Sequence, residues 1–295
     1  MTRVVSVVVP AYNAAPTLGD CLQALAAQSL TPADYEVLVV DDGSTDATAR
    51  IAAGFDVQVL SQQRQGPSGA RNTGLAAACG EWVAFTDADC IPSRGWLQAL
   101  LAAVERAPTE SVLGAAGRTI GYQSAAAAAR FVDLTGGLDA ERHLAHPQFP
   151  FAPSGNVMYQ RLALVAAGGF DRRYRTYEAC ELHTRLTRAH RGAFYFEPRA
   201  VVLHRHRACW TDFWRQQLGY GRGYAQFVLH HRDQIPWSVW RELAAWRDVA
   251  ALGLAACWRG DRDQALVRRG TFVKTLAQRC GFVTTYWSPA ERAQW

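Results

Sequence analysis

Two aspartates separated by one residue are the part of the sequence whose chemistry is easiest to name. Asp87 and Asp89 follow the apolar run 82–85, and Pro92 comes soon after. Because β-branched and aromatic residues favour strands and proline cannot continue a central one, the run predicts a buried strand that ends in two carboxylates. Alternation along an extended chain would point both carboxylates to the same side. Carboxylate oxygens suit a Mg²⁺ or Mn²⁺ ion that phosphates also hold, so we expect metal-assisted handling of a diphosphate; a solvated acidic loop is the plainer alternative.

Three earlier apolar runs, at 4–9, 35–40 and 57–60, predict further strands. Between them lie helical patterns, one of which begins with Thr17 and Asp20 in the spacing of a capping box. Strands that alternate with helices through short connections predict right-handed βαβ units in a mostly parallel sheet. Ligands of such sheets bind beyond the carboxyl ends of the strands. The sequence therefore predicts one site where several strand ends converge.

The rest of the chain is less regular. We expect helices at 124–131, 162–167 and 177–190, a long loop at 136–153, a strand at 154–159, and two short strands at 194–196 and 200–203 separated by Pro198. From Cys209 onward tryptophan and arginine become frequent, which predicts a catalytic domain at 1–208 and a helical extension at 209–295. Apolar residues from Val239 to Ala250 fall on one helical face. That helix packs on the catalytic domain in the simpler interpretation and touches a membrane surface in the other.

Composition narrows the choice of partners. The chain has 295 residues, 49% of them hydrophobic, and a net charge of +5, so it is a folded protein. Its basic residues are arginines apart from Lys274, and they are spread along the chain, which favours phosphorylated ligands or anionic lipid over nucleic acid. The seven cysteines form no Cys-x-x-Cys pair and the sequence shows no signal or spanning segment. We expect a cytoplasmic protein, with peripheral contact at the inner face of the membrane as an option.

Five motifs occur in a fixed order. They are Pro-Ala-Tyr-Asn at 10–13, Val-Val-Asp-Asp-Gly-Ser-Thr-Asp at 39–46, Gly-Pro-Ser-Gly-Ala-Arg-Asn-Thr-Gly-Leu at 66–75, Thr-Asp-Ala-Asp at 86–89 and Gly-Gly-Phe-Asp at 168–171. Through them residues 4–225 resemble the family 2 glycosyltransferases, whose GT-A fold is an α/β, Rossmann-like, mostly parallel sheet flanked by helices. The resemblance implies metal-dependent transfer of a sugar from a nucleotide diphosphate donor, a UDP-sugar by preference, with inversion. The acceptor stays open, either a small molecule or a lipid-linked one.

The resemblance also assigns roles to residues. The nucleotide would be bordered or bound by Pro10, Ala11, Tyr12, Asn13, Asp41 or Asp42, Gly66, Arg71 and Asp87. Asp89 would be the firmest metal ligand, and His204 a second one. Helix capping by Asp42 and a surface ion pair of Arg71 are the structural alternatives.

One position departs from the family pattern. Relatives carry Glu-Asp-x-Asp/Glu-Leu after Gly-Gly-Phe-Asp, with the Asp as general base, whereas this chain has Ala179 at that place. Since alanine cannot accept a proton, either Glu178 or Glu181 replaces the base, or an aspartate of the natural chain has been exchanged for alanine. A nucleotide-sugar-binding protein without turnover is the alternative function. A sugar nucleotidyltransferase is less well supported, because no glycine-rich loop follows the first strand.

Overall fold

The computed structural model describes residues 4–107, 111–123, 125–190, 192–257 and 260–294. The chain divides into two compact units. The first unit comprises residues 1–122, 138–173 and 178–204, and the second comprises residues 123–137, 174–177 and 205–295. The domain boundary expected between residues 208 and 209 stays a prediction; the second unit also takes in two segments from earlier in the chain.

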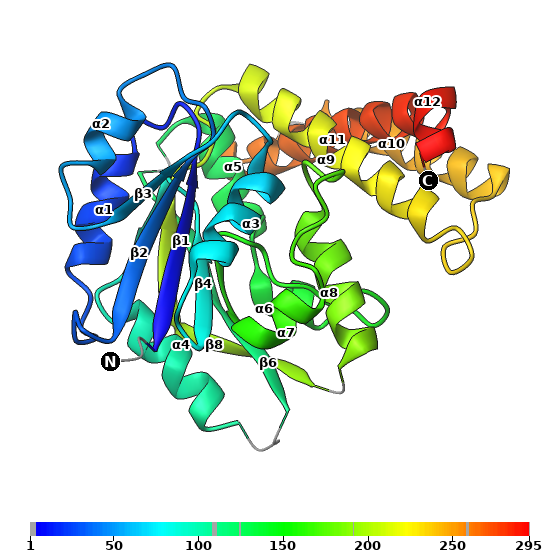
Figure 1. The fold of residues 1–295 in the computed structure, drawn as a ribbon. Helices are drawn as coiled ribbons and strands as arrows, with labels where there is room; N and C mark the ends of the chain where they lie inside the picture. The colour runs from blue at the N-terminus through cyan, green and yellow to red at the C-terminus, as the bar shows by residue number, and fades with distance from the viewer. Residues whose placement is uncertain (1–3, 108–110, 124, 191, 258–259, 295) are drawn as a thin grey trace. The chain divides into compact units, whose positions relative to one another are not determined.

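The first unit is built on one eight-stranded sheet with the order β3-β2-β1-β4-β7-β6-β8-β5. Its strands are β1 Val5–Ala11, β2 Tyr35–Asp41, β3 Gln58–Ser61, β4 Trp82–Thr86, β5 Cys90–Pro92, β6 Val112–Gly121, β7 Asn156–Gln160 and β8 Ala193–His204. Neighbours among β3, β2, β1 and β4 run parallel, as do β6 and β8. β7 is antiparallel to its neighbours β4 and β6, and β5 is antiparallel to β8. The predicted mostly parallel α/β sheet is confirmed (Figure 1).

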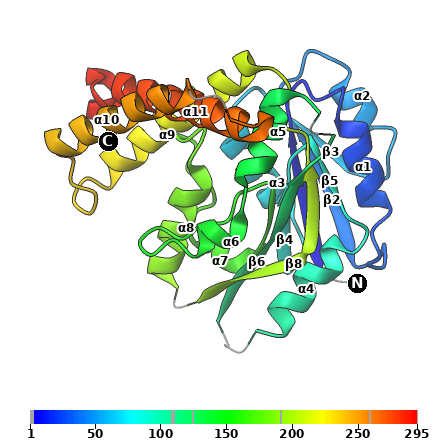
Figure 2. The same ribbon diagram turned by 180° about the vertical axis from the view of Figure 1, so that it is seen from behind.

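Helices cover both faces of this sheet. They are α1 Leu18–Ala26, α2 Thr48–Ala52, α3 Pro67–Ala77, α4 Trp96–Glu105, α6 Ala140–Leu144, α7 Arg161–Ala166 and α8 Glu178–Ala189. Side chains of β1 alternate between the two faces: Val7 packs in one apolar cluster with residues of α1 and α4, and Val8 packs in the other with residues of α3 and α7. A strand buried on both faces needs apolar residues at every position, which explains the unbroken run at its start. Figure 2 shows α4 beside β6 and β8.

Four sequence-based expectations were wrong in detail. Thr17 precedes α1, but its side chain forms no capping hydrogen bond with the helix. The expected loop at 136–153 contains α6. The two expected strands around Pro198 are one strand, β8, whose pairing with β6 shifts register between Gly117 and Arg118 and so passes the proline without a ladder bond. β4 ends at Thr86, so residues 87–89 form a turn and strand alternation does not orient their side chains.

The second unit is helical. It contains α5 Ala127–Thr135, α9 Trp210–His230, α10 Val239–Ala256, α11 Arg262–Tyr286 and α12 Pro289–Gln294. The expected helix at 124–131 is therefore present as α5, and residue 124 lies outside the described residues. Glycines allow α9 and α11 to approach closely, since a Cβ on Gly221 would lie 2.0 Å from the carbonyl oxygen of Gln278. Of the helices that the structure describes, none is long and apolar enough to cross a membrane.

Candidate active site

The carboxyl ends of three adjacent parallel strands bring the first candidate residues to one edge of the sheet. Ala11 at the end of β1 lies in register with Asp41 at the end of β2, and β4 pairs with β1 on the other side. The loop after β1 is held to the loop after β2, because the backbone N–H of Asn13 donates to Ser44 Oγ (2.9 Å) and the N–H of Thr45 donates to Asn13 Oδ1 (2.8 Å). These contacts join the two loops, residues 12–13 and 42–45, into one rim along the edge of the sheet.

Tyr12 stands on this rim and stays accessible. Its side chain is 39% exposed, and the Arg64 guanidinium carbon lies 4.0 Å from the centre of its ring. An exposed aromatic face beside a cation is suited to stacking on a planar group of a ligand. Pro10 and Ala11, by contrast, are the last two residues of β1 and contribute backbone.

The two neighbouring aspartates after β2 have different surroundings. Asp42 is buried, and its carboxylate accepts hydrogen bonds from Gln62 Nε2 (2.6 Å) and from the backbone N–H groups of Gln65 (2.7 Å) and Gly66 (2.8 Å). It therefore fastens the loop that leads into α3. Asp41 is also buried, and its Oδ1 accepts from the N–H of Ser44 (3.1 Å).

The glycines of the motif at 66–75 let α3 sit close to the sheet. Gly66 has φ +85°, a conformation that other residues rarely adopt, and Pro67 starts the helix directly after it. A Cβ on Gly74 would lie 2.3 Å from Cγ1 of Val8, so only glycine permits this contact between helix and strand. The close approach buries the inner face of α3, including Arg71.

Arg71 is the centre of a buried ionic network. Its side chain is only 4% exposed; Nη2 lies 2.7 Å from Asp87 Oδ1, and Nη1 lies 3.1 Å from Glu178 Oε1. Burial acts to lower the pKa of Arg71, but the charges of Asp87 and Glu178 outweigh it and raise the pKa, so the guanidinium stays charged. Ser154 Oγ donates a further hydrogen bond of 3.0 Å to Glu178 Oε1. Asp87 and Glu178, 91 positions apart in the sequence, thus share one cation.

Helix α8 presents the residues around the expected base. Ala179, next to Glu178 in its first turn, is buried at 6% exposure. Glu181 is fully buried, and both of its oxygens bind Arg185, Oε1 at 2.6 Å from Nε and Oε2 at 2.8 Å from Nη2. Arg185 in turn donates to the carbonyl oxygens of Ala167 and Gly169. Through Arg185, Glu181 therefore holds α8 to the Gly-Gly-Phe-Asp turn, and both of its carboxylate oxygens already have a partner.

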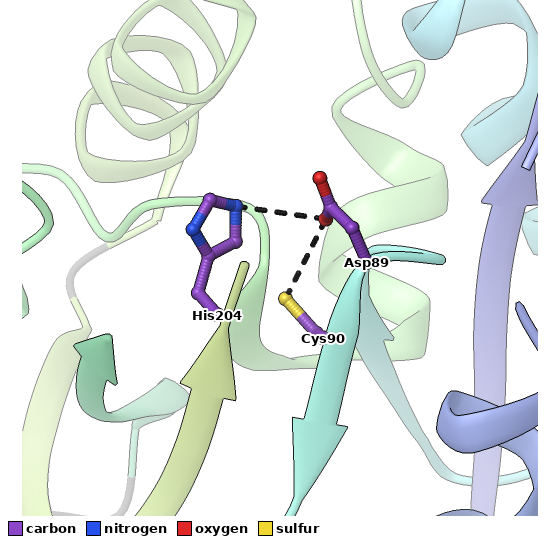
Figure 3. Close-up of side chains that lie close together, drawn as sticks. All are labelled: Asp89, Cys90 and His204. Atoms are coloured by element: carbon purple, nitrogen blue, oxygen red, sulfur yellow. Dashed lines mark hydrogen bonds and ion pairs between the residues drawn. The ribbon is translucent and has the colours of Figure 1, made fainter. Parts of the chain in front are cut away.

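A second cluster joins Asp89, Cys90 and His204 (Figure 3). Cys90 in β5 and His204 at the end of β8 face each other across an antiparallel pair, and Asp89 comes directly before β5. His204 Nε2 lies 3.5 Å from Asp89 Oδ1, and Cys90 Sγ lies 4.0 Å from the same oxygen. Each of these three residues offers one atom that could bind a metal, and the three atoms lie within 4.8 Å of one another.

This cluster fits a divalent ion in the chemistry of its donors. A carboxylate and an imidazole suit Mn²⁺, and a Mg²⁺ ion would use the carboxylate alone. Cys90 is the least suitable donor of the three, because a soft thiolate ranks behind oxygen and imidazole ligands for Mn²⁺ or Mg²⁺. Two protein donors leave most coordination positions for the oxygens of a diphosphate.

Sequence reasoning missed several residues of this region. Ser154 holds Glu178, and Gly155 allows Asp87 to come close, since a Cβ on Gly155 would lie 2.9 Å from Asp87 Oδ2. Asn72 was missed as well: its side chain accepts from the N–H of Phe170 (2.8 Å) and donates to the carbonyl oxygen of Phe170 (2.7 Å). A signal was available for Asn72, which lies in the motif at 66–75, whereas Ser154 and Gly155 lie outside the five motifs.

Comparisons with known proteins identify the family of the chain. Residues 6–165 match the model of glycosyl transferase family 2. A pre-mycofactocin glycosyltransferase of Mycobacterium tuberculosis is 33% identical over 242 residues, which are 79% of this chain and 49% of that protein. Glycosyltransferase AglE of Haloferax volcanii is 41% identical over 100 residues, 32% of this chain and 33% of that protein. The chain thus spans half or less of the length of these relatives.

Solved structures share the fold. The mannosyltransferase PcManGT from Pyrobaculum calidifontis, in complex with GDP-Man and Mn²⁺, aligns with a TM-score of 0.66 at 22% identity over 96% of this chain and 87% of its own. Glucosyl-3-phosphoglycerate synthase from Mycobacterium tuberculosis, in complex with Mn²⁺, UDP and phosphoglyceric acid, aligns with a TM-score of 0.55 at 23% identity over 80% of each chain. With the family match covering more than half of its residues, the chain belongs to glycosyl transferase family 2 and has the GT-A fold.

Proposed function

We propose that this protein is a metal-dependent glycosyltransferase that moves a sugar from a nucleotide diphosphate donor to an acceptor with inversion. The observation that carries the proposal is the pair formed by Asp89 and His204, whose Oδ1 and Nε2 atoms lie 3.5 Å apart. Asp89 comes two residues after Asp87, the carboxylate that Arg71 binds. Relatives named as glycosyltransferases and similarly folded enzymes bound to GDP-Man, UDP or UDP-GlcNAc support it. A UDP-sugar is the preferred donor on the family resemblance.

The nucleotide end of the donor is assigned to the rim at the strand ends. Tyr12 offers its exposed ring to the base, the backbone from Pro10 to Asn13 borders it, and Asp41 is the carboxylate available to hydrogen-bond it. Asp42 holds the loop before α3 instead, since three donors already bind it. Gly66 lets this loop turn into α3.

Asp89 and His204 would hold Mn²⁺ or Mg²⁺, which neutralises negative charge on a departing diphosphate. Arg71 is a positioning residue in this scheme. At 4% exposure and with two carboxylate partners, it orients Asp87 toward the ribose and Glu178 toward the acceptor rather than binding the diphosphate itself.

Glu178 is the carboxylate that we assign as substitute base. Arg71 and Ser154 both donate to its Oε1. Glu181, the other carboxylate considered from the sequence, is bound through both oxygens to Arg185 and is fully buried, so its contacts disfavour proton transfer. Successive helical side chains diverge by about 100°, so Glu178 does not fill the place of an aspartate at 179 and turnover should be slow.

The alternative is a protein that binds nucleotide sugars without transferring them. The specific observation in its favour is Ala179, a neutral and buried side chain where relatives carry the base. Donor consumption separates the two functions, because a binding protein consumes no donor whichever residue stands at 179. The same assays, run with small-molecule and with lipid-linked acceptors, distinguish these two classes of acceptor.

Calorimetry with UDP, with and without Mn²⁺, tests the metal site. Asp89→Ala should abolish the Mn²⁺-dependent part of UDP binding and leave the fold intact, because the carboxylate supplies the hardest ligand of the cluster. Asp56→Ala, which removes an exposed carboxylate from the same unit, is the matched control and should bind as the unchanged protein does. Equal Mn²⁺-dependent affinity in the protein and in Asp89→Ala would refute the site.

A further inference from the structure

Helix α10 exposes an apolar face. The apolar residues on this face follow the 3.6-residue repeat, and each is exposed over 37% to 79% of the residue's surface. The face consists of Val239 (49%), Trp240 (77%), Leu243 (56%), Trp246 (37%) and Leu254 (79%). Trp240 and Leu254 are each more than three-quarters exposed, and with their neighbours on this face they exceed the scattered apolar residues of an ordinary surface.

A flank of α10 beside this face packs in the helical unit. Val249 is buried, and Gly253 lies against the ring of Phe272, where a Cβ would be 3.2 Å away. Glu242 Oε2 and Arg279 Nη2 form an ion pair of 2.6 Å in which both side chains are mostly buried. α10 is thus fastened to α11 without using its apolar face, and both views show the two helices side by side (Figures 1 and 2).

Charge is divided unequally between the two units. By sequence the second unit carries sixteen Lys and Arg against eight Asp and Glu, a net charge of +8, whereas the first unit has a net charge of −3. The apolar face of α10 thus belongs to a unit with a surplus of positive charge, which favours a partner that offers apolar depth and negative charge. An anionic lipid bilayer has both properties.

We propose that α10 docks the protein on an anionic membrane surface, lying in the plane of the interface with its apolar face in the acyl boundary. At 18 residues the helix is roughly 27 Å long, and tryptophan prefers the headgroup level at which it would then sit. The helix does not qualify as a span, in keeping with a parallel rather than a crossing orientation. This docking goes beyond the proposed transfer reaction and does not depend on it.

Vesicle flotation without donor or metal tests the docking. The protein should float with vesicles of phosphatidylcholine and phosphatidylglycerol at low salt, less with phosphatidylcholine alone, and less when salt is raised. Leu243→Glu with Leu254→Glu should reduce the partition into anionic vesicles by at least about tenfold, since two side chains lose their transfer from water. Trp240→Ala should reduce it less, and it adds no charge.

The matched control lies in the first unit. Leu162→Glu with Val165→Glu adds the same two charges at apolar side chains that are 64% and 51% exposed on α7, and should retain most of the binding. All variants should keep the melting temperature and the solution affinity for UDP. Unchanged flotation of both α10 variants, equal losses in both pairs of variants, or no flotation of the unchanged protein would overturn the proposal.

Sedimentation velocity without lipid tests the other possible occupant of the apolar face, which is a second copy of the chain. The proposal expects a sedimentation coefficient that the α10 variants do not alter. A dimer that Leu243→Glu with Leu254→Glu converts to monomers would assign the face to self-association and overturn membrane docking. Loss of UDP binding with intact flotation would count against the proposed function alone.

Discussion

Replacing Arg71 by methionine tests the buried network most directly, because methionine keeps an unbranched, largely apolar stem and removes the guanidinium with its charge and donors. The change leaves two carboxylates without their shared cation. Glu178 is 12% exposed and Asp87 is 33% exposed, so water can compensate Asp87 far better than Glu178. Breaking a buried pair costs about 3–5 kcal/mol, and we expect Arg71→Met to lower the free energy of unfolding by that amount, mostly through Glu178.

Urea denaturation of four proteins measures this coupling. The set is the unchanged chain, Arg71→Met, Glu178→Gln and the double variant. Because Glu178→Gln removes the charge that Arg71→Met leaves unpaired, the double variant should be more stable than the sum of the two losses predicts, by about 1–3 kcal/mol.

Arg215→Met is the matched control for the loss of a guanidinium. Its Nη1 lies 2.9 Å from Asp212 Oδ1, and both side chains are exposed, Arg215 at 72% and Asp212 at 54%. An exposed pair contributes about 0–1 kcal/mol, so this variant should be nearly as stable as the unchanged protein. Equal losses for Arg71→Met and Arg215→Met, or strictly additive losses in the double variant, would refute the assignment of Arg71 as a buried positioning residue.

Three further predictions concern other parts of the first unit. Ala179→Asp should raise turnover by roughly 10² to 10⁴, the usual contribution of a positioned base, measured as donor consumption; a fast unchanged chain that Glu178→Gln inactivates would show that the base has moved by one residue. Burial lowers the pKa of His183 to about 3, so below about pH 6.5 the unfolded chain takes up a proton that the folded chain does not. Stability, complete above that pH, should fall by about 1.4 kcal/mol per pH unit toward pH 3, and urea curves at pH 7.5 and 5.0 should show His183→Gln losing less than the unchanged protein. Gly169→Ala should destabilise more than Gly168→Ala in the same assay: both have positive φ, but only at Gly169 would the Cβ meet another group, Asn72 Oδ1, at 2.4 Å.

The order of strands and helices was readable from local patterns. Continuous apolar runs predicted β1, β2 and β4, because a strand buried on both faces must be apolar at each position. The convergence of Tyr12, Asp41 and Asp87 followed from the parallel topology alone. Pro198 misled the prediction of β8, since the sequence does not show the register shift opposite it.

Which carboxylates are engaged was decided only by the tertiary structure. Asp41 and Asp42 are equivalent in the sequence, but three donors from the loop before α3 occupy Asp42. The partners of Arg71 lie 16 and 107 positions away, and Glu178 meets its arginine through one oxygen, whereas Glu181 meets Arg185 through both. Side-chain type and spacing determine what chemistry a residue can perform, but contacts between distant segments determine whether its oxygens are free to perform it, because each ion pair or hydrogen bond in a buried site uses donors that the chain brings together only on folding.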